Sequence, residues 1–282
     1  MSLLLIIKTV IMGIVEGVTE FLPISSTGHL IIVEQFLRLS NGGQLSPAFI
    51  SSFDVLIQPG AILAIVVLFW KTLWPFGGTQ EENARTWKLW GRVIIGTIPA
   101  AVLGFLFDKI ITGKLFNPLV VAITLVFYGI VLVVIERILR KGKAPKIEDV
   151  HNLTLSLALA IGFFQVLALI PGTSRSAATI VGAMILGLSR SSAAEFSFFM
   201  AIPIMAGASV LTLYKHASSF TGVEWEVLLI GFVVSFLLAL VVVRAFMNFI
   251  RKRDFVPFGY YRIVLGALVI VLLVVGVLTM HP

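Results

Sequence analysis

The sequence of 282 residues contains no cysteine, and only 12% of its residues are charged. Without cysteine, disulfides, thiolate catalysis and cysteine-based metal sites are excluded. A soluble domain usually has about 25% charged residues, so the low charge argues against a soluble protein. A large soluble α-helical protein would also need polar helix faces, and long stretches of this chain have none.

Hydrophobic residues make up 59% of the chain and gather in long blocks such as LVVAITLVFYGIVLVVI. Blocks of about 20 residues match the length of a transmembrane helix. The N-terminal apolar run continues into Glu16 without a small-residue cleavage site, so we expect mature protein there and no signal peptide. Six blocks are predicted to span a membrane: 50–70, 90–107, 118–137, 193–213, 226–249 and 258–279.

Two other apolar regions, 3–38 and 153–188, are each broken in the middle by a polar turn that contains proline. The turns read LPISSTGH and IPGTSRSA, and aligning their prolines places Ser26 over Ser174. Three spanning blocks follow each broken pair. The sequence therefore predicts an all-α polytopic membrane protein, with six transmembrane helices and two re-entrant helix pairs in an inverted-topology repeat.

The inversion follows from the number of crossings. A re-entrant pair leaves on the side where it enters, so each half crosses three times and the second half is inverted. The predicted repeats are 1–140 and 151–282, within a single membrane domain covering 1–282. The alternative is ten plain spans, which is less favoured because 29–38 and 173–188 are short for crossing about 30 Å.

Loop charge agrees with this topology. The inversion puts thirteen Lys and Arg on one side and five on the other. By the positive-inside rule the first side is cytoplasmic, and both termini, including Pro282, are then outside. Topology thus explains the net charge of +7, and no nucleic-acid partner is expected. The thirteen residues lie in the loops 71–92, 136–152, 189–192 and 250–257.

Ionisable groups at membrane depth are candidates for function. Glu16 and Glu20 are four residues apart on one helix face, where like charges repel. They are predicted to share a proton or to bind a cation, and a hard ion such as Mg²⁺ or Ca²⁺ suits oxygen ligands. The structural alternative is a carboxylate pair satisfied by buried donors. Gly13 and Gly17 form a G-x-x-x-G pattern that lets another backbone approach. The other ionisable candidates are His29, Asp54, Arg175, Glu195 and Arg244.

The two turns are rich in hydroxyl groups. Hydroxyls and free N–H groups at a helix N-terminus favour an anion, although capping alone explains Ser25. Arg175 suits phosphate, which a guanidinium grips with two hydrogen bonds; its structural alternative is an ion pair with Glu195 or Glu20. The combination predicts a phosphate or diphosphate site within the bilayer, and a polyprenyl phosphate as substrate. The residues are Ser25, Ser26, Thr27 and His29 in the first turn, and Thr173, Ser174, Arg175 and Ser176 in the second.

At these residues the sequence resembles the undecaprenyl pyrophosphate phosphatase family, the bacitracin-resistance proteins. The segments that carry the resemblance are EGVTEFLPISSTGH (16–29), FDVLIQPGAILAIVV (53–67), PGTSRSAATI (171–180) and SRSSAAEFSFFMAIP (189–203). The likeness covers most of the chain, and only the loop 77–87 differs. It implies metal-dependent hydrolysis of undecaprenyl diphosphate to the monophosphate in the bacterial inner membrane. That reaction recycles the lipid carrier of peptidoglycan synthesis, with the active site facing outside.

The resemblance also implies roles. Glu16 and Glu20 would bind metal or act as base, and Ser26 or His29 would attack or activate. Ser174 and Arg175 would grip the diphosphate. A water nucleophile stays open beside Ser26, and so does a homodimer. The rival function is a polyprenyl-phosphate flippase or another secondary transporter, because inverted repeats with broken helices are typical of transporters and fold alone does not separate the two. A non-catalytic scaffold would not need the polar turns.

Overall fold

The structure of the chain is a computed structural model that describes residues 1–39, 43–140 and 142–278. Throughout these ranges the secondary structure is helical, apart from one isolated bridge between Ile147 and Leu188. Two parts of the predicted topology, the external end at Pro282 and the cytoplasmic Lys141, lie outside the described residues.

Within the described ranges six helices are long and apolar enough to cross a membrane, and they confirm the six predicted spans. Three follow each of the broken regions, as expected. A short helix, α4 (Trp70–Leu73), connects the first two. The six are α3 (Pro47–Leu68), α5 (Gln80–Ile110), α6 (Pro118–Val134, continued by a π-helical turn Ile135–Leu139), α9 (Arg190–His216), α10 (Gly222–Ile250) and α11 (Val256–Val274).

Local sequence explains where several of these helices begin. Ser46 accepts a hydrogen bond from the Phe49 N–H, and proline takes the first helical position of α3. The same combination of cap and proline opens α6, where Asn117 is the cap. Helix α10 begins with a capping box between Thr221 and Glu224. Each cap satisfies backbone N–H groups that have no partner within the helix.

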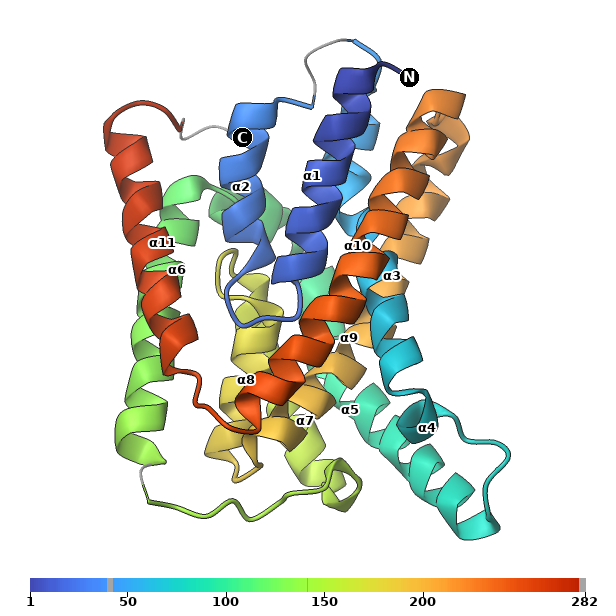
Figure 1. Cartoon of the computed structure of the whole chain (residues 1–282), viewed down its shortest axis with the longest axis vertical. Coiled ribbons are helices and arrows are strands. Elements are labelled where there is room, and N and C mark those ends of the chain that lie inside the picture. Colours follow the sequence, from blue (N-terminus) through green and yellow to red (C-terminus); the bar gives the residue numbers. More distant parts are fainter. Residues whose placement is uncertain (40–42, 141, 279–282) are drawn as a thin grey trace.

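The two broken regions form helical hairpins. The first consists of α1 (Leu3–Thr19) and α2 (Ser26–Leu37), and the second of α7 (Leu155–Val166) and α8 (Arg175–Ile185). Figure 1 shows that the first hairpin extends down from the upper end of the molecule and the second extends up from the lower end, so that their turns meet at mid-height. The same view places the basic loops between the spanning helices together at the lower end.

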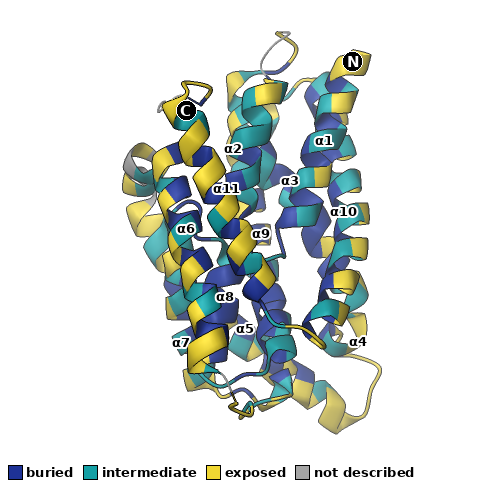
Figure 2. Ribbon diagram, turned by 60° about the vertical axis from the view of Figure 1, so that its left-hand side comes forward, coloured by how far each residue is buried: buried dark blue, intermediate teal, exposed yellow. Residues whose placement is uncertain are grey.

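The outer surface of the helices is apolar. Phe105 is 80% exposed, and Val241 and Val264 are also exposed although they lie in the middle of long helices. Figure 2 shows buried residues concentrated along the centre and exposed ones on the outward faces. A soluble monomer rarely exposes so large an apolar surface. This surface is that of a multi-pass membrane protein.

Glycine lets the hairpins pack closely against the spanning helices. A Cβ on Gly17 would lie 2.6 Å from the Ser235 carbonyl oxygen of α10, and one on Gly13 would lie 3.0 Å from the Gly231 oxygen. The close approach predicted from the G-x-x-x-G pattern is confirmed. On the other hairpin, a Cβ on Gly162 of α7 would collide with the backbone of α5. Each hairpin thus packs its first helix against the middle spanning helix of the other half.

Candidate active site

The second helix of each hairpin begins in the same way. Ser25 caps α2 and accepts from the Gly28 N–H, and Ser174 caps α8 and accepts from the Ala177 N–H. Both serines have positive φ, 73° and 71°, which is uncommon for a residue with a side chain. Such strain is held in place by the surrounding structure and gathers at functional sites. The caps equate Ser174 with Ser25 and not with Ser26, so the register read from the prolines was wrong by one residue.

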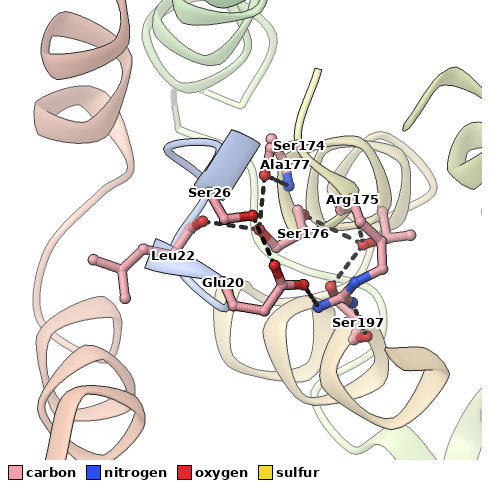
Figure 3. Close-up of polar contacts among 9 residues, drawn as sticks. Glu20, Leu22, Ser26, Ser174, Arg175, Ser176, Ala177 and Ser197 are labelled. Carbon is pink, nitrogen blue, oxygen red and sulfur yellow. Dashed lines mark hydrogen bonds and ion pairs between the residues drawn. The ribbon is translucent and has the colours of Figure 1, made fainter. Parts of the chain in front are cut away.

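The turns meet through an acid and an arginine. Glu20 follows the end of α1, and one of its carboxylate oxygens accepts from Arg175 across 3.3 Å. Its other oxygen accepts a 2.8 Å hydrogen bond from the Ser26 hydroxyl. The second arm of the Arg175 guanidinium donates to the Ser197 carbonyl of α9 at 2.9 Å. Figure 3 shows these groups converging from both hairpins, so of the two alternatives for an ion pair at Arg175, Glu20 is the observed partner.

A second set of contacts joins the turns through hydroxyl groups. The Ser176 hydroxyl donates to the Leu22 carbonyl oxygen at 2.9 Å and lies 2.9 Å from the Ser174 hydroxyl. Behind it, Thr179 and Ser197 share a 2.6 Å hydrogen bond that ties α8 to α9. Residues about 150 positions apart in sequence therefore form one continuous polar cluster (Figure 3).

Glu16 is the unusual member of the acid pair. Its side chain is fully buried, and neither carboxylate oxygen has a hydrogen-bond partner among the described residues. It lies within electrostatic range of Glu20, Asp54 and Arg175. An isolated carboxylate is very costly to bury, so this group needs a proton or a cation. The predicted alternative, a carboxylate pair satisfied by buried donors, does not describe Glu16.

His29 takes a separate position one turn into α2. One ring nitrogen lies 2.7 Å from the Ser25 carbonyl oxygen and the other 2.6 Å from the Tyr261 hydroxyl of α11. The two rings are also stacked, with centroids 5.5 Å apart. His29 therefore contacts the cap residue Ser25 through its carbonyl oxygen, whereas Glu20 contacts the next residue, Ser26, through its hydroxyl. Thr27 lies in the same first turn and is half-buried.

An arginine on α11 fastens both turns together. Arg262 is fully buried and donates to the Pro23 carbonyl of the first turn at 3.2 Å. It also donates to the Gly172 and Thr173 carbonyls of the second turn at 2.9 and 3.0 Å. Three carbonyls that the turns leave outside any helix are satisfied by one side chain.

Comparison with known proteins places this chain in a family. The family model for "Bacitracin resistance protein BacA" matches residues 9–268, which is nearly the whole chain. The chain belongs to the BacA family. It is 49% identical over 278 residues to Undecaprenyl-diphosphatase 1 of Oenococcus oeni, covering 97% of this chain and 98% of that protein.

Two further relatives of this BacA-family chain cover it almost as fully. Undecaprenyl-diphosphatase 1 of Clostridioides difficile is 52% identical over 271 residues, 95% of this chain and 96% of the relative. Undecaprenyl-diphosphatase of Fusobacterium nucleatum is 52% identical over 267 residues, 94% and 99% of the two chains. These matches confirm the resemblance seen in the two polar motifs.

Most residues predicted for the site lie in or beside the two turns of this BacA-family fold. Three further candidates lie on spanning helices, namely Asp54 on α3, Glu195 on α9 and Arg244 on α10. Glu195 is near Arg251 and Asp149, at the end of the molecule with the basic loops. Sequence reasoning missed Arg262, although an arginine inside the apolar block 258–279 was a signal that pointed to it. Arg244 is exposed on α10, consistent with its exclusion from the core of the site.

The donor set also suits the predicted metal. No group of three or more His, Asp or Glu side chains that could hold an ion occurs in the part of the chain that the structure describes. A site here would instead use the two carboxylates, Glu16 and Glu20, with other oxygen ligands. The unpartnered oxygens of Glu16 are of the kind that hard cations take. These oxygens suit Mg²⁺ or Ca²⁺ by chemical type, and the ion itself stays a prediction.

Proposed function

We infer that the chain is an undecaprenyl-diphosphatase, an integral membrane enzyme that hydrolyses undecaprenyl diphosphate to undecaprenyl phosphate and inorganic phosphate. Relatives of that name match at about half identity over nearly the full length. The observation that carries the function at the level of the site is the Glu20–Arg175 contact between the two turns. It joins an acid and a hydroxyl-rich helix start to a guanidinium, and phosphoryl transfer uses a base to activate the nucleophile and cationic groups to stabilise the developing charge. The reaction recycles the lipid carrier of peptidoglycan synthesis and accounts for bacitracin resistance.

We propose further that the halves 1–140 and 151–282 are an inverted repeat whose hairpins are re-entrant. Support comes from reciprocal packing, since α1 lies against α10 and α7 against α5. Alignment on the caps also pairs Gly13 with Gly162, the glycines at those two contacts. The same alignment pairs Glu16 with Gln165, and both side chains are buried with unpartnered polar atoms. Only the first half then carries the acid.

We propose that the site opens to the outer face of the bacterial inner membrane. The thirteen-to-five distribution of Lys and Arg supports a cytoplasmic location for the end with the basic loops. The first hairpin then enters from outside and carries the reacting groups. A diphosphate head would reach them from the outer side, with its polyprenyl chain among membrane lipids. A homodimer stays a prediction.

In the proposed complex the two helix starts bind the diphosphate. N–H groups at the starts of α2 and α8 and the hydroxyls around them favour an anion, and Arg175 provides positive charge. Arg175 exchanges its contact with Glu20, in part, for phosphate oxygens. The hydroxyls proposed to bind are those of Ser25, Thr27, Thr173, Ser174 and Ser176.

For the chemistry we propose that the Ser26 hydroxyl attacks the terminal phosphorus. Attack by His29 or by a water is the alternative to be tested. Ser26 already donates to Glu20 at 2.8 Å, within the range expected of a general base. The Ser26 oxygen would bond to the terminal phosphorus as the anhydride oxygen leaves on the lipid monophosphate, and Glu20 would take the proton. Water then hydrolyses the phosphoserine. His29 holds the cap at Ser25 and so positions the turn.

Glu16 and Glu20 are the proposed metal ligands. A bound Mg²⁺ or Ca²⁺ supplies positive charge that stabilises the charge on phosphoryl oxygens. Glu16 has the stronger requirement for the ion because its buried oxygens have no hydrogen-bond partner in the part of the chain that the structure describes. Besides binding the metal, Glu20 would accept the proton of Ser26, and it also contacts Arg175.

The test is phosphate release from undecaprenyl diphosphate by the purified protein in detergent, with and without a chelator. An enzyme releases phosphate in micelles, and the chelator stops it until Mg²⁺ or Ca²⁺ is restored. A flippase or another transporter needs two compartments and releases none. Phosphate release that a chelator does not affect would support the phosphatase function but contradict the proposed metal site.

A further inference from the structure

A second polar feature lies at the end of the molecule that carries the basic loops. There a cavity of about 330 Å³ opens between the end of α6, the end of α8 and the loop 142–149. It is a full helix away from the hairpin turns, because α8 runs eleven residues, about 16 Å, from Arg175 to Ile185. Its main lining residues are Leu139, Met184 and Ile185 on the apolar side, and Arg140, Lys143 and Lys146 on the cationic side.

The positive charge of this cavity is not neutralised by its walls. Among the described residues that line it there are three cations and no acid. Arg140 donates to the Met184 carbonyl at 2.9 Å and to the Leu188 carbonyl. These carbonyls fix the guanidinium in place but carry no charge. The neighbouring acid, Glu136, lies outside the lining within electrostatic range of Arg140, and it accepts two 2.7 Å hydrogen bonds from Arg190.

The loop that carries the lysines is held against the bundle. The Lys146 N–H donates to the Gly187 carbonyl at 2.8 Å, and the Ser189 N–H donates to the Ile147 carbonyl at 2.8 Å. The Lys146 side chain extends over Gly187, where an added Cβ would lie 3.3 Å from its Cδ. Lys143 and Lys146 are exposed at the rim. The backbone bonds thus keep this part of the rim in position beside Arg140.

The apolar side of the cavity continues onto the lipid-facing surface. Leu139 and Ile185 are 48% and 49% exposed, and Ile138 beside them is 68% exposed. A free phosphate would not need such a wall. A phospholipid would, because its acyl chain continues from its charged headgroup. Basic pockets between membrane helices on the cytoplasmic side are typical sites for anionic headgroups.

We propose that this cavity binds one anionic phospholipid. The phosphodiester lies among Arg140, Lys143 and Lys146, and an acyl chain lies along Leu139 and Ile185. The ligand is separate from the substrate of the hairpin site. The proposal does not depend on the reaction catalysed at the turns.

The test compares two double variants that remove equal charge. Lys143→Gln/Lys146→Gln removes the rim cations, and Lys88→Gln/Lys252→Gln removes two exposed lysines of the same end outside the cavity. Each protein is titrated in neutral detergent with dioleoyl phosphatidylglycerol. Native mass spectrometry counts bound lipid, and the midpoint of thermal unfolding gives the linked shift. Dioleoyl phosphatidylcholine and glycerol phosphate are the reference ligands.

We expect one tightly bound phosphatidylglycerol and a higher unfolding midpoint for the wild type and for the Lys88/Lys252 variant. In the Lys143/Lys146 variant the affinity falls roughly tenfold or more, given the attraction of each lysine for anionic lipid. An equal loss of lipid affinity in both double variants would show only a general attraction between the basic end and anionic lipid, and it would overturn the proposed site. An equal response to phosphatidylcholine would overturn the charge selection, and an equal response to glycerol phosphate would replace the lipid with a free anion.

Discussion

Replacement of Arg262 by methionine tests whether one side chain holds the two turns together. Methionine keeps most of the volume but leaves three carbonyls, of Pro23, Gly172 and Thr173, without their donor. A buried group left unsatisfied costs about 1–3 kcal/mol. Removing a buried guanidinium recovers several kcal/mol of desolvation. The cost of the three unsatisfied carbonyls exceeds the recovered desolvation energy, and the difference predicts a loss of about 2 kcal/mol in the free energy of unfolding.

The loss of turnover should be larger than the loss of stability. The turns carry Glu20 and Arg175, and a displacement of about 1 Å at a reacting group reduces the rate by about 10²-fold. Phosphate release and the thermal midpoint are measured in one detergent for Arg262→Met, Arg262→Lys and the control Arg244→Met. The exposed Arg244 should tolerate methionine, and lysine should restore part of the stability. Normal turnover in Arg262→Met would refute the reasoning that this arginine positions the site.

Three further predictions concern the turns and the helix contacts. Arg175→Lys should lose nearly as much phosphate release as Arg175→Ala, because an ammonium cannot replace a guanidinium that donates to Glu20 and to the Ser197 carbonyl together. An active lysine variant would show that Arg175 acts only as a generic cation. Gly17→Ala should lower the free energy of unfolding by about 1–3 kcal/mol, since its Cβ meets the backbone of α10. Gly207→Ala faces open space and should raise the free energy of unfolding by about 0.5–1 kcal/mol, and equal effects of the two changes would contradict the close contact at Gly17. Glu16→Gln should abolish both turnover at saturating Mg²⁺ and any Mg²⁺-dependent rise in the midpoint, while the folded yield is kept; an unchanged Mg²⁺ response would remove Glu16 from the metal site.

The sequence predicted those parts of the fold that depend on local pattern. Apolar blocks of membrane length identified α3, α5, α6, α9, α10 and α11, because hydrophobic length decides whether a helix can cross. Proline and clustered hydroxyls located the breaks between α1 and α2 and between α7 and α8. The cap at Ser25 followed from the same composition, whereas the cap at Ser174 was not predicted.

Contacts between distant segments were beyond local pattern. Arg175 had two acids as candidate partners, and only packing places Glu20 beside it while Glu195 lies near Arg251. The bonds from Arg262 to both turns and from Tyr261 to His29 join α11 to segments more than 80 residues away. The second turn is one residue longer before its cap, which a comparison of prolines could not detect.

The central claim is that the two turns form one catalytic unit, and the rates of Glu20→Gln, Arg175→Lys and the double variant test it most directly. Phosphate release from undecaprenyl diphosphate is measured in detergent for the three variants and the wild type. Groups that act as a unit are strongly non-additive, so each single change should lower the rate about 10²-fold or more, and the double variant should be no slower than the slower single. Losses that multiply in the double variant would show two independent sites and contradict the account.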